Sequence, residues 1–174
     1  GIAPCTVTMS AQRNLTATFA PILHQVGVSR AGDGSGTVTS DVGGLNCGTT
    51  CSATLQQATS LTLTATATPG SVFTGWGGDC AGSASSCSLT LDGDRAATAT
   101  FKTLYPLGIS SAGTGGGTVA SDDDWIDCGA TCFHAYASGT TVTLAATPDA
   151  GSRFDGWGGA CVGTGSCVVA LDQE

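Results

Sequence analysis

The chain has 174 residues, a formal net charge of −8 and only 10% charged residues. Its five basic residues include a single lysine, so it lacks the basic patch that nucleic-acid phosphates require, and we expect no nucleic-acid partner. It also contains no run of about 20 apolar residues, so we expect no membrane-spanning segment.

Short alternating runs predict β-strands along the chain, and no window has a helical period. Threonine occupies one face of these runs and leucine, valine or phenylalanine the other, which is typical of a half-buried strand. Glycine-rich turns separate the runs, for example at residues 32–36 and 112–117, so the sequence predicts an all-β protein. The clearest alternating runs are residues 5–9, 14–19, 60–68 and 141–145.

The chain repeats itself with an offset of 81 residues. Residues 70–80, GSVFTGWGGDC, return as residues 151–161, GSRFDGWGGAC, and a partial third copy at residues 5–19 matches residues 87–101. Phe19 and Phe101 each end the last strand of a copy, and the proline that follows each of them predicts a short, semi-rigid junction. We therefore expect the last hairpin of a preceding repeat (1–20), a complete repeat (21–103) and a second repeat that lacks its last strand (104–174).

A periodic array of small modules indicates a mainly architectural protein. Each module should have about six or seven short antiparallel strands, and its core alone is marginal at this size. Catalysis needs one unique set of residues, whereas the motifs here are duplicated. We therefore expect no enzyme activity, no catalytic residue and no cofactor, and modules arranged like beads on a string.

The repeated motifs carry a family resemblance. Both copies contain G-T-V, then C-G-x-x-C, then F-x-G-W-G-G-x-C at residues 73–80 and 154–161. Over nearly its whole length the chain resembles the bacterial extracellular repeats called divergent InlB B-repeats. The resemblance implies compact β-grasp-like or sandwich-like modules in tandem, in a secreted or cell-surface bacterial protein, and it implies no defined ligand.

Nine cysteines follow the repeat and indicate a disulfide framework formed in an oxidising compartment. Their spacing favours bonds within local pairs over a zinc site, which needs four converging thiolates. Pairing across the module, such as Cys47 with Cys80, stays open. The partner of Cys5 is expected to lie before Gly1, outside the chain. The expected local pairs are Cys47–Cys51, Cys80–Cys87, Cys128–Cys132 and Cys161–Cys167.

Two tryptophans recur at matched positions and are expected to fill the core of each module. Trp76 should pack near Phe73, and Trp157 near Phe154. Exposed rings would instead stack on sugars, so the exposure of these tryptophans separates a structural module from a carbohydrate-binding one. Trp125 has no aromatic counterpart in the other copy and is the better candidate for a surface contact.

An acidic loop precedes Cys128 and contains Asp122, Asp123, Asp124 and Asp127. Several carboxylates in one loop are a weak candidate for a Ca²⁺ site, because oxygen atoms are the ligands that this ion prefers. The loop has no EF-hand spacing, so a solvated acidic loop is the favoured interpretation and we expect no metal.

Together these features predict a structural or adhesive repeat segment of a bacterial extracellular or cell-surface protein, acting as a spacer in a stalk or fibre. The alternative is a carbohydrate- or surface-binding module appended to a secreted enzyme. Neighbouring repeats or copies of the same chain are the expected partners, and a surface glycan or a host or matrix protein is a further candidate.

The ends of the chain suggest two hypotheses. The second repeat stops before the strand that corresponds to residues 95–101, while residues 13–19 have the sequence of such a strand. In the favoured hypothesis, the chain is a window of a longer array and flanking residues fill both gaps. In the other, strand addition between copies gives a head-to-tail filament. The donated residues would be Asn14, Leu15, Ala17 and Phe19.

Overall fold

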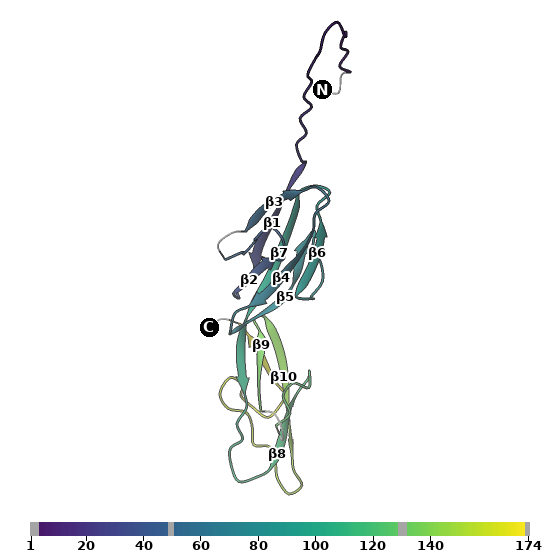
Figure 1. Cartoon of the computed structure of the whole chain (residues 1–174). Helices are drawn as coiled ribbons and strands as arrows, with labels where there is room; N and C mark the ends of the chain where they lie inside the picture. Colours follow the sequence, from purple (N-terminus) through teal and green to yellow (C-terminus); the bar gives the residue numbers. More distant parts are fainter. Residues whose placement is uncertain (1–3, 49–50, 129–131, 173–174) are drawn as a thin grey trace.

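The computed structural model describes residues 4–48, 51–128 and 132–172, which form eleven β-strands and no helix. This described part accordingly holds no helix with the length and apolarity to cross a membrane. Figure 1 shows an elongated molecule with two β units end to end and an N-terminal segment that extends beyond the first. The strands are β1 (Leu23–Ala31), β2 (Gly36–Ser40), β3 (Ser52–Gln56), β4 (Ser60–Ala67), β5 (Ser71–Gly78), β6 (Ser86–Thr90), β7 (Arg95–Gly108), β8 (Gly117–Ser121), β9 (Phe133–Ala137), β10 (Thr140–Pro148) and β11 (Cys167–Leu171).

Unit 1, which comprises β1 to β6 and residues 95–103 of β7, is built from two sheets. One sheet has the strand order β3-β1-β7-β5 and the other the order β2-β4-β6. All pairs are antiparallel except β1 and β7, which run in the same direction. The sequence predicted antiparallel strands and gave no sign of this parallel pair, because its two members lie far apart in the chain.

The core of unit 1 takes side chains from both sheets. Alternation along β4 turns Leu61 and Leu63 inward and the threonines outward, as expected for a half-buried strand. Phe101 of β7 is fully buried and its ring centroid lies 5.6 Å from that of Phe73. Residue 36 must be glycine, because a Cβ there would lie 2.2 Å from the Phe101 ring.

One strand belongs to both units. The first part of β7 pairs with β1 and β5, whereas residues 104–108 pair with β9 of unit 2. Pro106 lies inside this second part, where β9 is the only strand paired with β7 in the described chain. Proline lacks an N–H, so such an edge position is where a strand tolerates it. The junction expected between residues 103 and 104 is therefore the middle of a continuous strand.

Unit 2 comprises residues 104–108 of β7 and strands β8 to β11, and it has fewer strands than unit 1. Its sheet β11-β10-β8 matches β6-β4-β2, and its β7–β9 pair matches β1–β3. Residues 152–159 have the sequence of β5 but form only an isolated bridge between Trp157 and Gly163. In unit 1 the neighbour of β5 is residues 95–103, and no strand in the described part of unit 2 takes that place. The edge of unit 2 is therefore open.

The two repeated tryptophans differ in burial because, in the described chain, only unit 1 has a strand beside the tryptophan segment. Trp76 is 8% exposed, and its indole N–H donates to the carbonyl of Ala84 at 2.9 Å. Trp157 keeps the matched bond to the carbonyl of Gly165 and packs against Phe154, with ring centroids 5.0 Å apart, but both rings are only half-buried. The expectation of a mostly buried ring thus describes Trp76 better than Trp157.

The N-terminal segment, residues 4–22, forms no strand. The sequence predicted strands at residues 5–9 and 14–19, but these residues form no strand and their side chains are exposed. Phe19 is 90% exposed, whereas Phe101, the residue it matches, is fully buried. Alternation alone does not make a strand, because backbone groups also need a partner strand.

We predict that Trp76→Ala lowers the free energy of unfolding of unit 1 by about 3–5 kcal/mol, the range for removing a core aromatic ring. Trp157→Ala should cost unit 2 about half as much, since this ring loses less buried area. Urea denaturation followed by circular dichroism measures both values. Equal costs for the two variants would contradict the structural difference.

Candidate functional site

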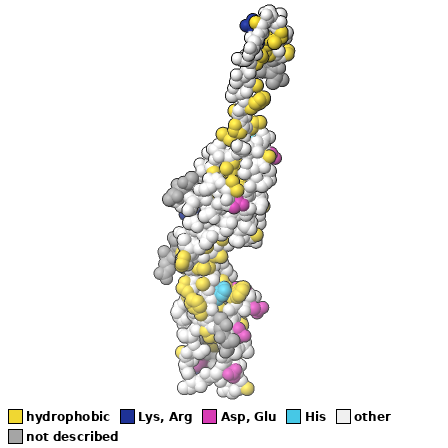
Figure 2. Space-filling model, viewed as in Figure 1, with side chains coloured by type: hydrophobic (Ala, Val, Ile, Leu, Met, Phe, Trp, Pro, Cys, Tyr) yellow, Lys and Arg dark blue, Asp and Glu magenta, His cyan; other side chains and the backbone are white. Residues whose placement is uncertain are grey.

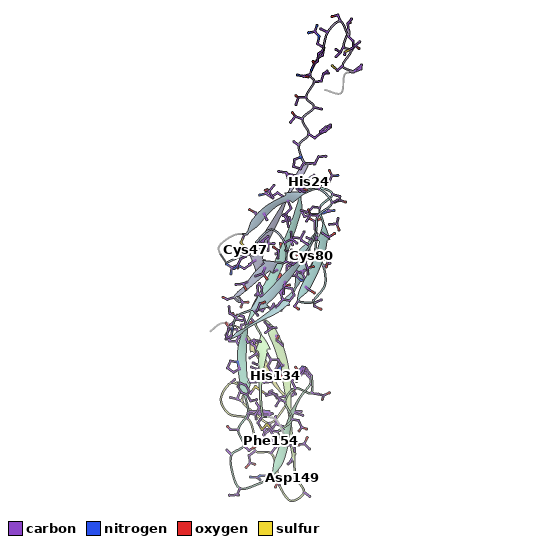
Figure 3. All side chains as sticks on the ribbon, viewed as in Figure 1. His24, Cys47, Cys80, His134, Asp149 and Phe154 are labelled. Carbon is purple, nitrogen blue, oxygen red and sulfur yellow. A yellow bond between two sulfur atoms is a disulfide. The ribbon has the colours of Figure 1, made fainter. Side chains whose placement is uncertain are left out.

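The four disulfides each close one local pair. Cys47–Cys51 lies in the connection between β2 and β3, just before β3, and Cys80–Cys87 joins the chain after β5 to β6. Unit 2 repeats this arrangement with Cys128–Cys132 and Cys161–Cys167. Figure 3 shows Cys47 and Cys80 on opposite sides of unit 1. These bonds brace loops within a unit, and none of them connects the two units.

Cys5 belongs to the exposed N-terminal segment and forms no bond within the described residues. Its matched residues, Cys87 and Cys167, are both bonded. The prediction that its partner precedes Gly1 stays a prediction.

Polar contacts tie the two units together at their junction. The carboxylate of Asp33, in the β1–β2 loop, accepts a hydrogen bond from the Ser138 hydroxyl at 2.8 Å and one from the Thr103 N–H at 3.3 Å. The ammonium group of Lys102 donates to the Ser138 carbonyl at 2.9 Å. The Ser138 hydroxyl, the Thr103 N–H and the charge of Lys102 together hold the pKa of Asp33 below its usual value. We call Asp33, Lys102, Thr103 and Ser138 the junction contact.

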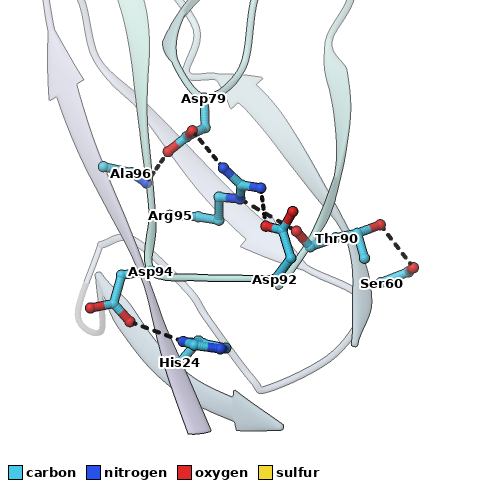
Figure 4. Close-up of polar contacts among 8 residues, drawn as sticks. All are labelled: His24, Ser60, Asp79, Thr90, Asp92, Asp94, Arg95 and Ala96. Carbon is cyan, nitrogen blue, oxygen red and sulfur yellow. Dashed lines mark hydrogen bonds and ion pairs between the residues drawn. The ribbon is translucent and has the colours of Figure 1, made fainter. Parts of the chain in front are cut away.

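A second polar network holds the beginning of β7 (Figure 4). The guanidinium group of Arg95 lies between the carboxylates of Asp79, at 3.2 Å, and Asp92. Asp79 also accepts a hydrogen bond from the Ala96 N–H at 2.7 Å. That N–H, helped by Arg95, lowers the pKa of the Asp79 carboxyl. This network could not be predicted from the repeat, because the second copy has Ala160 in place of Asp79.

An aromatic cluster is specific to unit 2. Trp125, which is 61% exposed, stacks on His134 with ring centroids 4.7 Å apart and planes 18° apart. His134 and Tyr136 are two positions apart on β9, so they share a face, and their rings meet edge to face at 4.6 Å. We call Trp125, His134 and Tyr136 the aromatic surface. Figure 2 shows a histidine among hydrophobic side chains at the surface of unit 2, where Figure 3 labels His134.

Unit 1 has no such surface, since Gly44, Ala53 and Leu55 occupy the matched positions. The sequence singled out Trp125 but not His134 or Tyr136. The signal that was missed is that all three aromatic side chains replace small or aliphatic ones in the same repeat.

Asp123 holds two residues of the aromatic surface in place through hydrogen bonds. One of its oxygens accepts hydrogen bonds from the Ser121 hydroxyl, the Trp125 N–H and the Tyr136 hydroxyl. Partial burial opposes ionisation, but these three bonds outweigh it and lower the pKa of Asp123. Burial also raises the pKa of the Tyr136 phenol, and the charge of Asp123 acts in the same direction.

The acidic loop does not gather its carboxylates around one point. Asp122 accepts from the Thr143 N–H at 3.0 Å, whereas Asp123 faces Tyr136. In the part of the chain that the structure describes, no three histidine, cysteine or acidic side chains meet in a way that could hold a metal ion. Asp124 adopts a φ of 63°, which is uncommon for a residue other than glycine.

Comparison with known proteins places the chain in a repeat family. The family model of the divergent InlB B-repeat domain matches residues 27–104 and residues 107–171. No curated protein and no solved structure matches the chain significantly. The two matched segments correspond to the two units and leave out the exposed N-terminal segment. They cover most of the sequence, and the chain therefore belongs to the divergent InlB B-repeat family.

Proposed function

We propose that this chain is a structural segment of a secreted or surface-exposed bacterial protein, in which its repeats act as spacers of a stalk. Family membership supports a repeat segment of a bacterial surface protein, and four disulfides are consistent with an oxidising location. The observation that carries the spacer role is the continuous strand β7, which joins unit 1 to unit 2 without a flexible linker.

The junction contact supports this role because it restrains bending about β7. A connection through β7 alone would allow one unit to pivot, but Asp33 reaches from unit 1 to Ser138 in unit 2. A spacer needs a defined length and orientation, and it needs no unique reactive group. We accordingly propose no catalytic activity for this segment.

The spacer role predicts a narrow distribution of distances between the units. Spin labels at Thr64 and Ala145, two exposed matched positions on β4 and β10, report this distance by pulsed electron resonance. Asp33→Asn should broaden the distribution, because a neutral amide oxygen accepts the hydrogen bond of the Ser138 hydroxyl more weakly than a carboxylate does. Asp41→Asn is the matched control, since Asp41 accepts from Thr62 inside unit 1.

Acidification should have the same effect as Asp33→Asn. The pKa of Asp33 is lowered in the folded chain, so its contribution is present above the unfolded value of about 3.9 and is lost as the pH falls through the folded value. The distribution should therefore broaden below about pH 4 in the parent and stay unchanged in Asp33→Asn. A broad distribution at neutral pH in the parent chain would refute the spacer role.

The open edge of unit 2 supports a second proposal, which concerns assembly. In unit 1, residues 97, 99 and 101 point inward, and in the N-terminal segment the matched residues are Leu15, Ala17 and Phe19. We propose that a strand with this pattern fills the open edge, supplied by a neighbouring repeat or by a second copy of the chain. In unit 1, residues 95–103 form a single strand that is parallel to β1 and antiparallel to β5. A strand that fills the open edge of unit 2 would accordingly run parallel to residues 104–108 of β7 and antiparallel to residues 152–159.

Strand donation between copies predicts that the chain forms head-to-tail oligomers in sedimentation velocity experiments. Ala17→Asp should abolish them, because this side chain would face the core of the completed unit. Thr18→Asp is the matched control, since its counterpart Thr100 is only partly buried, and it should leave the oligomers intact. A chain that stays monomeric at all concentrations would exclude donation between copies and leave the neighbouring repeat as the source of the strand.

The aromatic surface favours surface binding as a second candidate function. Trp76 is buried and so cannot offer a face to a sugar, but Trp125 is exposed and held flat against His134. A sugar ring could stack on the free face of Trp125, with the nearby carboxylates accepting hydrogen bonds from its hydroxyl groups.

Glycan-array binding with purified protein tests this second candidate. Trp125→Ala should lower the affinity at least about tenfold, which is about 1.4 kcal/mol for a lost stacking contact. Phe133→Ala is the matched control, because Phe133 is similarly exposed on β9 but does not belong to the aromatic surface. Binding that survives Trp125→Ala, or no binding by the parent chain, would remove this candidate.

A further inference from the structure

We propose that β1 and β7 form a mechanical clamp that makes unit 1 resistant to a pulling force along the chain. The inference deepens the spacer role and rests on it, because only a segment held at both ends of a stalk carries such a load. It concerns the response of unit 1 to force, which is a different property from its length or rigidity at rest.

The direction of the strands is the first step. The chain enters unit 1 at Leu23, the first residue of β1, and leaves it along β7 after Thr103. The two strands run parallel and are direct neighbours, with Val26 opposite Arg95 and Ala31 opposite Thr100. Figure 1 shows the N-terminal segment leaving one end of unit 1 and β7 leaving the other. Tension between these ends therefore pulls β1 and β7 in opposite directions along their own axes.

This geometry loads the whole contact at once. When parallel neighbours are pulled from opposite ends, all hydrogen bonds between them bear the force together, in shear. When two strands are pulled apart from the same end, the bonds break one after another, and each needs only a small force. Six residue pairs form the β1–β7 contact, so shear distributes the load over the entire set.

Hydrogen bonds that involve side chains reinforce the contact between β1 and β7 and extend it by one residue. The Gln25 N–H donates to the Asp94 carboxylate at 2.8 Å, and the hydroxyls of Ser29 and Thr98 lie 2.8 Å apart. The network around Arg95 fixes the first residues of β7 to Asp79 and Asp92, so this end of the strand does not fray (Figure 4). The clamp thus begins one residue before its first backbone pair.

Burial protects the clamp from water. Val26 and Ala99 are fully buried and Val28 and Ala97 nearly so, so one face of the contact is inside the core. Each strand also has a second neighbour, β3 beside β1 and β5 beside β7. Water that could replace a stretched hydrogen bond therefore reaches the contact from few directions.

The disulfides of unit 1 lie outside the clamp, and they change the length of chain that is released when the clamp breaks. Cys47–Cys51 and Cys80–Cys87 span 4 and 7 residues, and neither links β1 to β7. They do not prevent β1 and β7 from separating. The residues inside each disulfide loop cannot extend, however, so the unfolded chain is shorter while the bonds are intact. Reduction should therefore lengthen the rupture step of unit 1 by about 30 Å, given up to about 3.6 Å per freed residue.

Single-molecule pulling of the full chain compares two attachment geometries in a Cys5→Ser background. Handles at Leu23→Cys and Pro106→Cys apply shear, whereas handles at Leu23→Cys and Gly93→Cys peel the same two strands from one end without removing a contact of the clamp, because a Cβ at residue 93 would meet no atom within 4 Å. All three sites lie outside the core of unit 1. At equal loading rate we expect the shear rupture force to be at least about twice the peeling force, because the bonds break together.

Equal forces in the two geometries would overturn the clamp while leaving the spacer role untouched, since that role is tested in the unloaded chain. The unmodified chain, held by handles at its two ends, provides a second measurement. Its highest-force event should lengthen by about 20 Å in Cys80→Ala/Cys87→Ala, which frees a 7-residue loop of unit 1 only. A highest-force event of unchanged length in this variant would place the resistance elsewhere and refute the clamp.

Discussion

Unit 1 depends on the insertion of its last strand between two strands that formed earlier in the chain. Residues 95–103 of β7 pair with β1 on one side and with β5 on the other, and they carry Phe101 into the core. Phe73 then packs on Phe101, and Trp76 packs on Phe73 with ring centroids 5.3 Å apart. One strand therefore supplies the hydrogen-bond partners of both β1 and β5, and it also positions the aromatic side chains of the core.

Unit 2 shows what remains when no described strand takes this place. Its three-stranded sheet and its disulfides are those of unit 1, so they do not require the inserted strand. What changes is local: residues 152–159 form no strand, and Trp157 is only half-buried where Trp76 is buried. The three-stranded sheet and the disulfides therefore form from nearby residues, whereas the strand at residues 152–159 and the burial of its tryptophan need a partner strand from farther along the chain.

The sequence predicted the local features well and the distant ones poorly. Alternation located β4, and the repeat offset indicated a tandem all-β protein of this family. It could not show that β1 and β7 run parallel, because nothing in residues 23–31 identifies a partner about 70 positions away. The same alternation at residues 14–19 predicted a strand that the structure does not form, since a strand requires a partner as well as a pattern. Trp125 was found because it breaks the repeat, but its support by His134 and Asp123 depends on side-chain packing.

The parallel pair also determines the order in which a unit can fold. Ser29 and Thr98 meet across 69 residues, so β1 has no partner on its β7 side until nearly the whole unit has been synthesised. Such a high contact order makes the closing step slow compared with hairpin formation. Completion then has a second effect, because residues 104–108 of the same strand become available to β9 of the next unit. Completing unit 1 thus places the first strand of unit 2, and folding can pass from one unit to the next along β7.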